Sequence, residues 1–156
     1  MVGIEAPAPL PRSGAQRRRD TEHRLTHDVD VWVATASAEG APYLVPLSFE
    51  WDGVTLLLAT RADNPTGSNL VANPVVRLAL GDTRDVTMID GEVEVLPLDA
   101  VSQERGDRFA ARTGFDPRAT GPSYRWFRVT PRQVQAWREV DELSGRELMR
   151  DGHWMV

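Results

Sequence analysis

Hydrophobic and polar positions alternate most regularly between residues 31 and 80, and this stretch carries the clearest structural signal in the chain. Residues 31–36 and 43–51 both alternate with a period of two, which places successive side chains on opposite faces of a strand. Residues 54–60 are apolar at most positions, as expected of a strand buried on both faces. Asp52-Gly53 separates the last two runs and predicts a tight type I′ hairpin, because glycine tolerates the positive φ of that turn. The pattern therefore predicts a three-stranded antiparallel meander.

A short helix with a capped start is predicted directly after this meander. Asn64 is a good N-cap, Pro65 suits the first helical position, and the helix is expected to end before Asn73-Pro74. The start of a helix offers unpaired backbone N–H groups and the positive end of its dipole, so it can hold an anion, and Thr66 and Ser68 could add hydroxyl groups. From spacing alone, the simpler interpretation is that Asn64-Pro65 caps a connecting helix.

The rest of the chain predicts more short strands with few helices between them, which is typical of a small β-barrel. Asp90-Gly91 interrupts a long strand and is compatible with a hairpin, while Asp99 is the expected cap of a helix that ends at Thr113, before Gly114. The predicted elements are a helix over residues 15–27, a helix over residues 99–113, strands over residues 75–80, 86–96, 124–130 and 133–137, and a hairpin over residues 146–156.

Length and composition narrow the class of protein. A length of 156 residues predicts a single domain, which we expect over residues 15–156. Residues 1–14 are rich in proline and are expected to form a flexible arm. The formal charge of −5 disfavours nucleic-acid binding, and the absence of cysteine excludes disulfides and cysteine-ligated metals. The sequence contains neither an apolar run long enough to cross a bilayer nor a signal-peptide core, so we expect no membrane association and a cytoplasmic location.

The sequence is poor in groups that perform chemistry by themselves. It contains no GxSxG, GxGxxG or Walker motif. His23 and His27 lie one helical turn apart, but the HExxH general base and a third ligand are missing, so no metal site is expected. The arginines near them predict a solvated helix face or, alternatively, contact with an anionic cofactor tail or a partner subunit. Such a chain suits a cofactor that supplies its own reactivity.

The order and spacing of several segments resemble the flavin-binding split-barrel family of pyridoxamine 5′-phosphate oxidase-like proteins. These segments are VWVAT, EGAPYLVPLSFEWDG, LLLAT, NPVVRLAL and TRDVTMIDGEVEVLP, followed by FRVTPRQVQAW and GRELMRDGHW. The resemblance implies a mainly β fold, a six- to seven-stranded antiparallel split barrel, in which Asp90-Gly91 is a bulge or bend inside one continuing strand. It also implies FMN, or alternatively a deazaflavin, at the interface of a homodimer. The five tryptophans of the chain suit such an interface or the core.

The resemblance assigns the cofactor contacts position by position. The strand around Ser48 would run beside the isoalloxazine ring, Ala59 and Thr60 would contact the ribityl–phosphate portion, and Trp137 would come from the second subunit or else lie in the core. The expected cofactor-binding residues are Leu44, Val45, Pro46, Leu47, Ser48, Phe49, Ala59, Thr60, Arg61, Asn64, Pro65, Thr66, Ser68, Asn69, Asp85, Trp137 and Arg146.

This chain departs from the family pattern in ways that change the expected function. Pro65 and Thr66 stand where the oxidases have basic phosphate ligands, and Ser68 stands where closer relatives have an arginine, so hydroxyls, helix N–H groups and Arg61 would have to hold the phosphate. Asp85 replaces a glutamine that contacts the flavin, and an ionised carboxylate cannot donate a hydrogen bond. Residues 139–145 hold no counterparts of the groups that grip pyridoxal phosphate, so oxidation of pyridoxamine phosphate is not expected.

The sequence thus predicts a flavin-dependent oxidoreductase that transfers hydride or electrons to a small organic substrate. Two alternatives stay open. One is a protein that binds a flavin, a deazaflavin or haem without turnover, and the other is a degenerate relative that has lost its phosphate site.

Overall fold

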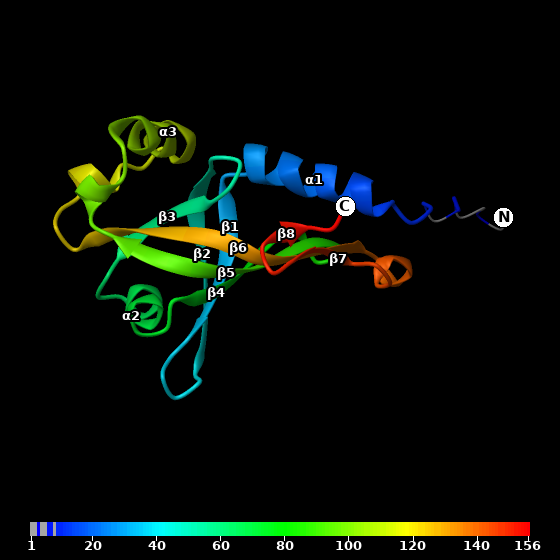
Figure 1. The fold of residues 1–156 in the computed structure, drawn as a ribbon, viewed down its shortest axis with the longest axis horizontal. Helices are drawn as coiled ribbons and strands as arrows, with labels where there is room; N and C mark the ends of the chain where they lie inside the picture. Colours follow the sequence, from blue (N-terminus) through cyan, green and yellow to red (C-terminus); the bar gives the residue numbers. More distant parts are fainter. Residues whose placement is uncertain (1–2, 4–5, 8) are drawn as a thin grey trace.

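The computed structural model describes residues 3, 6–7 and 9–156 and consists of a twisted antiparallel barrel with helices at its sides (Figure 1). The described helices are α1 (Gly14–His27), α2 (Pro65–Ala72) and α3 (Gln103–Thr113), with 3₁₀ turns at Leu98–Ala100, Pro117–Ala119 and Val140–Glu142. The strands are β1 (Asp30–Ala36), β2 (Pro42–Trp51), β3 (Leu56–Arg61), β4 (Val75–Asp82), β5 (Asp85–Leu96), β6 (Tyr124–Arg138), β7 (Glu147–Arg150) and β8 (His153–Trp154).

In the part of the chain that the structure describes, the strands form one sheet in the order β3-β2-β1-β4-β5-β6-β7-β8, and a further pairing of β3 with β6 closes the first six into a barrel. Every pairing is antiparallel. The prediction of a mainly β antiparallel split barrel is therefore confirmed, and β7 and β8 extend the sheet beyond the closed part. The core fills the barrel with inward-facing residues such as Val33, Phe49, Leu58, Leu78 and Ile89, each fully buried.

The predicted β1–β2–β3 meander is confirmed, but the turn between β2 and β3 differs from the expected type I′ hairpin. Trp51 pairs with Leu56, so the loop contains four residues rather than two. The Asp52 carboxylate accepts hydrogen bonds from the backbone amides of Val54 and Thr55, at 2.9 and 2.7 Å. Of the two residues that a type I′ turn would place at positive φ, only Gly53 has it. The side chain of Asp52 therefore closes the turn in place of the expected backbone geometry.

A β-bulge lies where β5 crosses the middle of β6. Asp90 pairs with Gln133 and Gly91 pairs with Pro131, so Arg132 is one extra residue on β6. β5 continues without a break, as the family resemblance implied, and residues 124–138 form one strand rather than the two predicted around Pro131. A Cβ at Gly91 would lie 2.5 Å from Cγ1 of Val129, so glycine permits the close crossing.

The predicted cap of α2 at Asn64 and the predicted end of α3 before Gly114 are confirmed. Ser13 caps α1 and Asn64 caps α2 through their side chains, and Gly114 ends α3 at a φ of 73°. Asp99 was the expected cap of α3, and this was wrong. It lies in the short 3₁₀ turn, and Ser102 caps the helix by accepting a hydrogen bond from the Arg105 amide at 3.2 Å.

Candidate functional site

A cavity of about 360 Å³ opens on the outer face of the barrel beside β2 and β3. Its volume lies within the range of small-molecule sites in proteins. The cavity collects residues that the sequence had assigned to a cofactor, namely Pro46, Leu47, Ser48, Ala59 and Thr60. It is also lined by residues that the sequence analysis did not single out, namely Asp30, Phe109, Phe115 and Tyr124.

The register of β1 and β2 forms the floor of this cavity. Asp30 pairs with Ser48, and Trp32 pairs with Pro46. Because side chains alternate along a strand, Pro46 and Ser48 point outward while Phe49 is completely buried in the core. The Ser48 hydroxyl donates a hydrogen bond of 2.7 Å to the Asp30 carboxylate. Only the backbone of Phe49 is therefore available to a ligand on this face.

α3 supplies the wall opposite to the sheet. Arg105 of α3 is buried, and its Nε donates a hydrogen bond of 2.8 Å to the Glu50 carboxylate on β2. This pair fixes the helix over the hairpin and carries Phe109 to the cavity, where its ring packs edge-on against Trp126 at 5.0 Å. Phe115 follows the end of the helix, and its ring centroid lies 5.5 Å from that of Tyr124.

The loop between β3 and α2 already satisfies most of its own polar groups. Asn64 accepts a hydrogen bond from the Gly67 amide at 2.8 Å and donates one to the Thr60 hydroxyl at 2.7 Å. Arg61 donates to Asp63 at 2.9 Å through two nitrogens, and this bond lowers the pKa of Asp63 while it raises the pKa of Arg61. Thr66 is only 2 % exposed.

The other predicted residues of this region differ in how well a ligand could reach them. Leu44 is 60 % exposed on the outer face of β2, and Ser68 and Pro65 are exposed on α2. Val45 is half-buried, and the Asn69 amide donates a hydrogen bond of 3.0 Å to Thr35.

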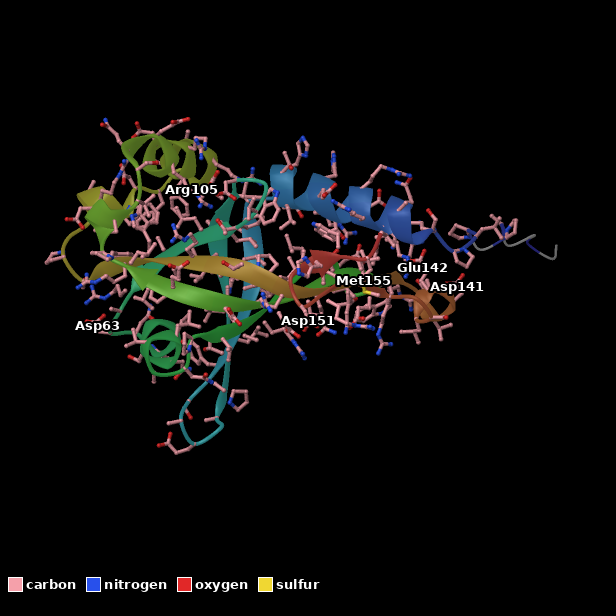
Figure 2. The ribbon with its side chains drawn as sticks, in the orientation of Figure 1. Asp63, Arg105, Asp141, Glu142, Asp151 and Met155 are labelled. Carbon is pink, nitrogen blue, oxygen red and sulfur yellow. The ribbon has the colours of Figure 1, made fainter. Side chains whose placement is uncertain are left out.

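Asp85, Trp137 and Arg146 form a second group at the opposite end of the barrel. The Arg146 guanidinium lies over the Trp137 ring at 5.6 Å. On β6, Trp137 follows twelve residues after Arg125, which pairs with Thr60, and this is about 40 Å of strand at about 3.3 Å per residue. In Figure 2, Asp63 of the loop after β3 and Glu142 of the segment after β6 lie far apart along the long axis. One chain therefore does not bring the two predicted groups together.

Asp85 belongs to a charge cluster that ties the start of α1 to the segment after β6. Its carboxylate pairs with Arg12 and with Arg24, both at 3.0 Å. Arg12 also binds the fully buried side chain of Glu142 at 2.7 Å, and Glu142 accepts a 2.7 Å hydrogen bond from the Arg138 amide. Mainly through its hydrogen bond, Arg12 lowers the pKa of Glu142 to about 2. No local pattern in the sequence signals this cluster, because its partners lie far apart in the chain.

Arg12 falls within residues 1–14, for which a flexible arm was expected. Residues 1–2, 4–5 and 8 of that range lie outside the described residues, so the arm stays a prediction there. The described Arg12 is held at three carboxylates.

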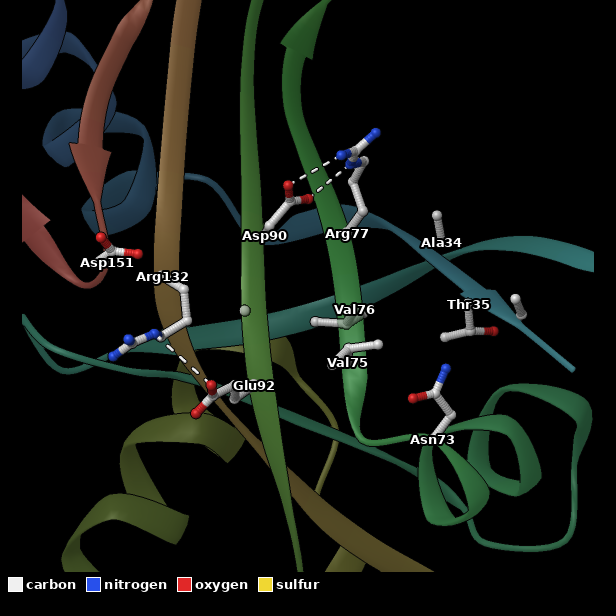
Figure 3. Close-up of a pocket in the computed structure, with 12 residues that line it drawn as sticks. Ala34, Thr35, Asn73, Val75, Val76, Arg77, Asp90, Glu92, Arg132 and Asp151 are labelled. Carbon is white, nitrogen blue, oxygen red and sulfur yellow. Dashed lines mark hydrogen bonds and ion pairs between the residues drawn. The ribbon is translucent and has the colours of Figure 1, made fainter. Parts of the chain in front are cut away.

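An apolar surface covers the outer face of the sheet next to the cavity. Trp32 is 49 % exposed, and a hollow of about 290 Å³ is lined by Trp32, Ala34, Leu44, Ala79 and neighbouring residues. A larger and more open hollow lies alongside it on the same face, where the ion pairs Arg77–Asp90 and Arg132–Glu92 cross the strands (Figure 3). Exposed apolar patches of this kind mark interaction surfaces.

The described residues contain neither a metal centre nor a membrane-spanning helix. No group of three or more histidine, aspartate or glutamate side chains there is arranged to hold a metal ion. None of the described helices combines the length and the apolar character that crossing a membrane requires.

Comparison with known proteins places this geometry in a family. The sequence profile described as pyridoxamine 5′-phosphate oxidase matches residues 24–138. No curated protein sequence matches the chain. Similar solved structures include an F420 reductase with 22% identity and a TM-score of 0.61, for which the match covers 72% of this chain and 94% of that chain.

Two other similar solved structures are described as binding or storing other cofactors. A FAD-binding protein from Mesorhizobium loti is 21% identical over 80% of this chain and 92% of that chain, with a TM-score of 0.62. The haem storage protein HutZ from Vibrio cholerae is 15% identical over 88% of this chain and 99% of that chain, also with a TM-score of 0.62. At these identities the likeness shows the fold alone.

Proposed function

Because the chain belongs to the pyridoxamine 5′-phosphate oxidase family, we propose that it is a flavin-dependent oxidoreductase that binds FMN in the cavity beside β2 and β3. The observation that carries the proposal is the gathering of Pro46, Leu47, Ser48, Ala59 and Thr60 around one cavity of about 360 Å³. The family resemblance assigns each of these residues to the cofactor from the sequence alone, and the fold brings them together.

The residues of the cavity fit the ring and the ribityl chain of a flavin. Ser48 and Thr60 offer hydroxyls on the side of the sheet, and Phe115 and Tyr124 form an aromatic wall of the cavity that excludes water. At the phosphate end, Asn64 already occupies the Gly67 amide, so the charge of Arg61 is the available attraction. Arg61 is exposed and must exchange its Asp63 partner for the phosphate.

The proposal includes a homodimer. In one chain, Trp137 and Arg146 lie about 40 Å of strand from Thr60, which is too far for one flavin to touch both groups. The partner subunit's Trp137 and the partner subunit's Arg146 would complete the site. The apolar surface around Trp32 and Leu44 lies beside the cavity and is the face that we assign to the contact.

The chemistry of the proposed reaction belongs to the cofactor. A bound flavin accepts and donates hydride or single electrons, and the protein supplies position and surroundings. Here the outer face of β2 would hold the ring, while the Ser48 hydroxyl holds the Asp30 carboxylate at the edge of the cavity. Phe109 and Phe115 restrict access of water from the α3 side.

Binding of a flavin or deazaflavin without turnover is a second candidate function. The lining of the cavity favours it, because Asp30 and Tyr124 are the only titratable side chains among the lining residues that the structure describes. The capped start of α2 and the Arg61–Asp63 pair reduce the attraction for a phosphate, and they would favour a relative that has lost its phosphate site. Haem is less favoured, since the cavity is lined by no histidine among the described residues. The cytoplasmic location stays an expectation from the sequence.

The visible absorption spectrum of the purified full chain, with mass spectrometry of whatever heat releases, tests the proposal. We expect a flavin spectrum, or one that appears on titration with FMN, and bleaching by a reductant followed by reoxidation by an acceptor. Bound flavin that no donor or acceptor changes would support binding without turnover. Failure of the chain to bind FMN or a deazaflavin would overturn both.

Substitutions locate the site. Ser48→Phe fills the cavity and should abolish FMN binding, whereas Ala41→Phe adds the same ring at an exposed position outside the cavity and should not. Equal binding by both variants would remove the cavity from the proposal. Asp63→Asn should raise the affinity for FMN and leave that for riboflavin unchanged, because it frees Arg61 for the phosphate.

A further inference from the structure

The cavity contains one carboxylate that no cation neutralises. Asp30 is exposed at its edge, and within the described part of the chain its carboxylate makes a hydrogen bond with the Ser48 hydroxyl but no ion pair. Because Ser48 donates to only one of the two oxygens, the second oxygen keeps its capacity to accept.

This lack of a partner distinguishes Asp30 from other carboxylates on the outer face of the sheet. Along β5, Asp90 pairs with Arg77 at 2.7 Å, Glu94 pairs with Arg128 at 3.0 Å and Glu92 pairs with Arg132 at 3.8 Å. Each partner lies on a neighbouring strand. The fold thus pairs the outward carboxylates of β5 and leaves Asp30 free beside a cavity.

The walls around Asp30 suit a positive charge as well. The rings of Phe115 and Tyr124 lie 5.5 Å apart, and the faces of aromatic rings attract cations. The other lining residues that the structure describes are uncharged, so an anionic group beside Asp30 would meet its charge with no compensating group. The FMN phosphate of the proposed function would lie at Arg61, which is outside this lining.

We propose that the cavity selects a small planar organic cation with N–H donors, and that Asp30 is its counter-charge. The cation would lie against Phe115 and Tyr124 and donate to the free oxygen of Asp30. This inference rests on the proposed function, because it names the substrate class of the same site. It makes Asp30 a specificity-determining residue and Ser48 the residue that orients it.

Three probes of nearly the same shape and different charge test the proposal. Benzamidine is a planar cation, benzamide is its neutral counterpart and benzoate is the anion. Calorimetric titration of the full chain should give benzamidine an affinity about tenfold higher than that of benzamide, as expected for one charge-assisted hydrogen bond, and no measurable binding of benzoate. Equal binding of the three probes would overturn the proposal.

Substitutions test whether Asp30 causes the preference for benzamidine over benzamide. Asp30→Asn should lower benzamidine affinity about tenfold, to the level of benzamide, and leave benzamide unchanged. Glu39→Gln removes the same charge from an exposed turn outside the cavity and should change neither. Discrimination that survives Asp30→Asn would contradict the assignment. If that variant does not fold, the native chain can be titrated at rising salt concentrations. Salt should then lower the affinity for benzamidine and not that for benzamide, and an equal decrease for both probes would contradict the assignment to Asp30.

An FMN titration in parallel separates this inference from the proposed function. A chain that prefers benzamidine and binds FMN supports both. A chain that prefers benzamidine and binds neither FMN nor a deazaflavin keeps the cation site and loses the flavin proposal. A chain that binds FMN and does not distinguish the three probes keeps the flavin and overturns the cation specificity.

Discussion

Replacing Glu142 with glutamine tests the buried charge cluster that holds the residues before α1 against the segment after β6. The Glu142 carboxylate accepts hydrogen bonds from the Arg12 amide, the Arg12 guanidinium and the Arg138 amide, each at 2.7 Å. Glu142→Gln keeps the shape, removes the charge and turns an NH₂ group toward some of these donors, so the free energy of unfolding should fall.

The size of the loss follows from the pKa of Glu142, which Arg12 lowers from 4.5 to about 2. Such a shift corresponds to about 3 kcal/mol at neutral pH, and solvent screening of a cluster that includes half-exposed members reduces this to about 2 kcal/mol. In a domain of this size, a loss of about 2 kcal/mol lowers Tm by about 4–8 °C.

The difference in the free energy of unfolding between the native chain and Glu142→Gln should decrease as the pH falls. Because the pKa of Glu142 is lower in the folded chain than in the unfolded chain, its contribution is complete above about pH 5 and less than half remains at about pH 3. The stability difference between the native chain and Glu142→Gln should shrink over the same interval and vanish as the pH falls through about 2.

Urea unfolding followed by tryptophan fluorescence, at about pH 7, 5 and 3, measures this difference. Glu94→Gln is the matched control, because Glu94 forms an exposed pair with Arg128 at 3.0 Å and its loss should change the free energy of unfolding by less than about 0.5 kcal/mol. A difference for Glu142→Gln that is equal at pH 7 and pH 3, or no larger than that of the control, would refute the reasoning.

Three further substitutions probe the proposed site and the proposed dimer. Trp137→Ala should weaken FMN binding at least tenfold with little change in Tm, and unchanged affinity in an absorbance titration would remove Trp137 from the site. Leu44→Arg places a charge on the apolar outer face and should shift the mass measured by light scattering to that of one chain. Thr66 is only 2 % exposed, so Thr66→Glu would disturb the fold; Ser68→Glu is exposed and should weaken FMN about threefold relative to riboflavin in paired titrations.

The fold was largely readable from the sequence because its signals are local. The period of two over residues 31–36 and 43–51 marks strands without reference to any partner, and Asn64 and Gly114 mark helix ends through the chemistry of single residues. The error at Asp99 has the same origin. Asp99 and Ser102 are both good caps, and the packing of the helix on the barrel selects Ser102.

The site was only partly readable, because a cavity depends on register and on contacts between distant segments. Ser48 and Thr60 were found through the family pattern, whereas Asp30 became a neighbour of Ser48 only once β1 and β2 were paired. Phe115 reaches the cavity because Arg105 fixes α3 through Glu50, and nothing local to Phe115 signals that position.

The extra residue at Arg132 determines which side of the barrel wall each later side chain of β6 occupies. Before it, odd-numbered positions such as Phe127 and Val129 face inward, and after it the even-numbered Val134 and Ala136 do. If β6 ran through Arg132 as a regular strand with no bulge, Trp137 would fall in phase with Val129 and turn into the barrel. The bulge at Arg132, five residues before Trp137, thus determines that this indole lies on the outside of the barrel, where a second subunit could contact it.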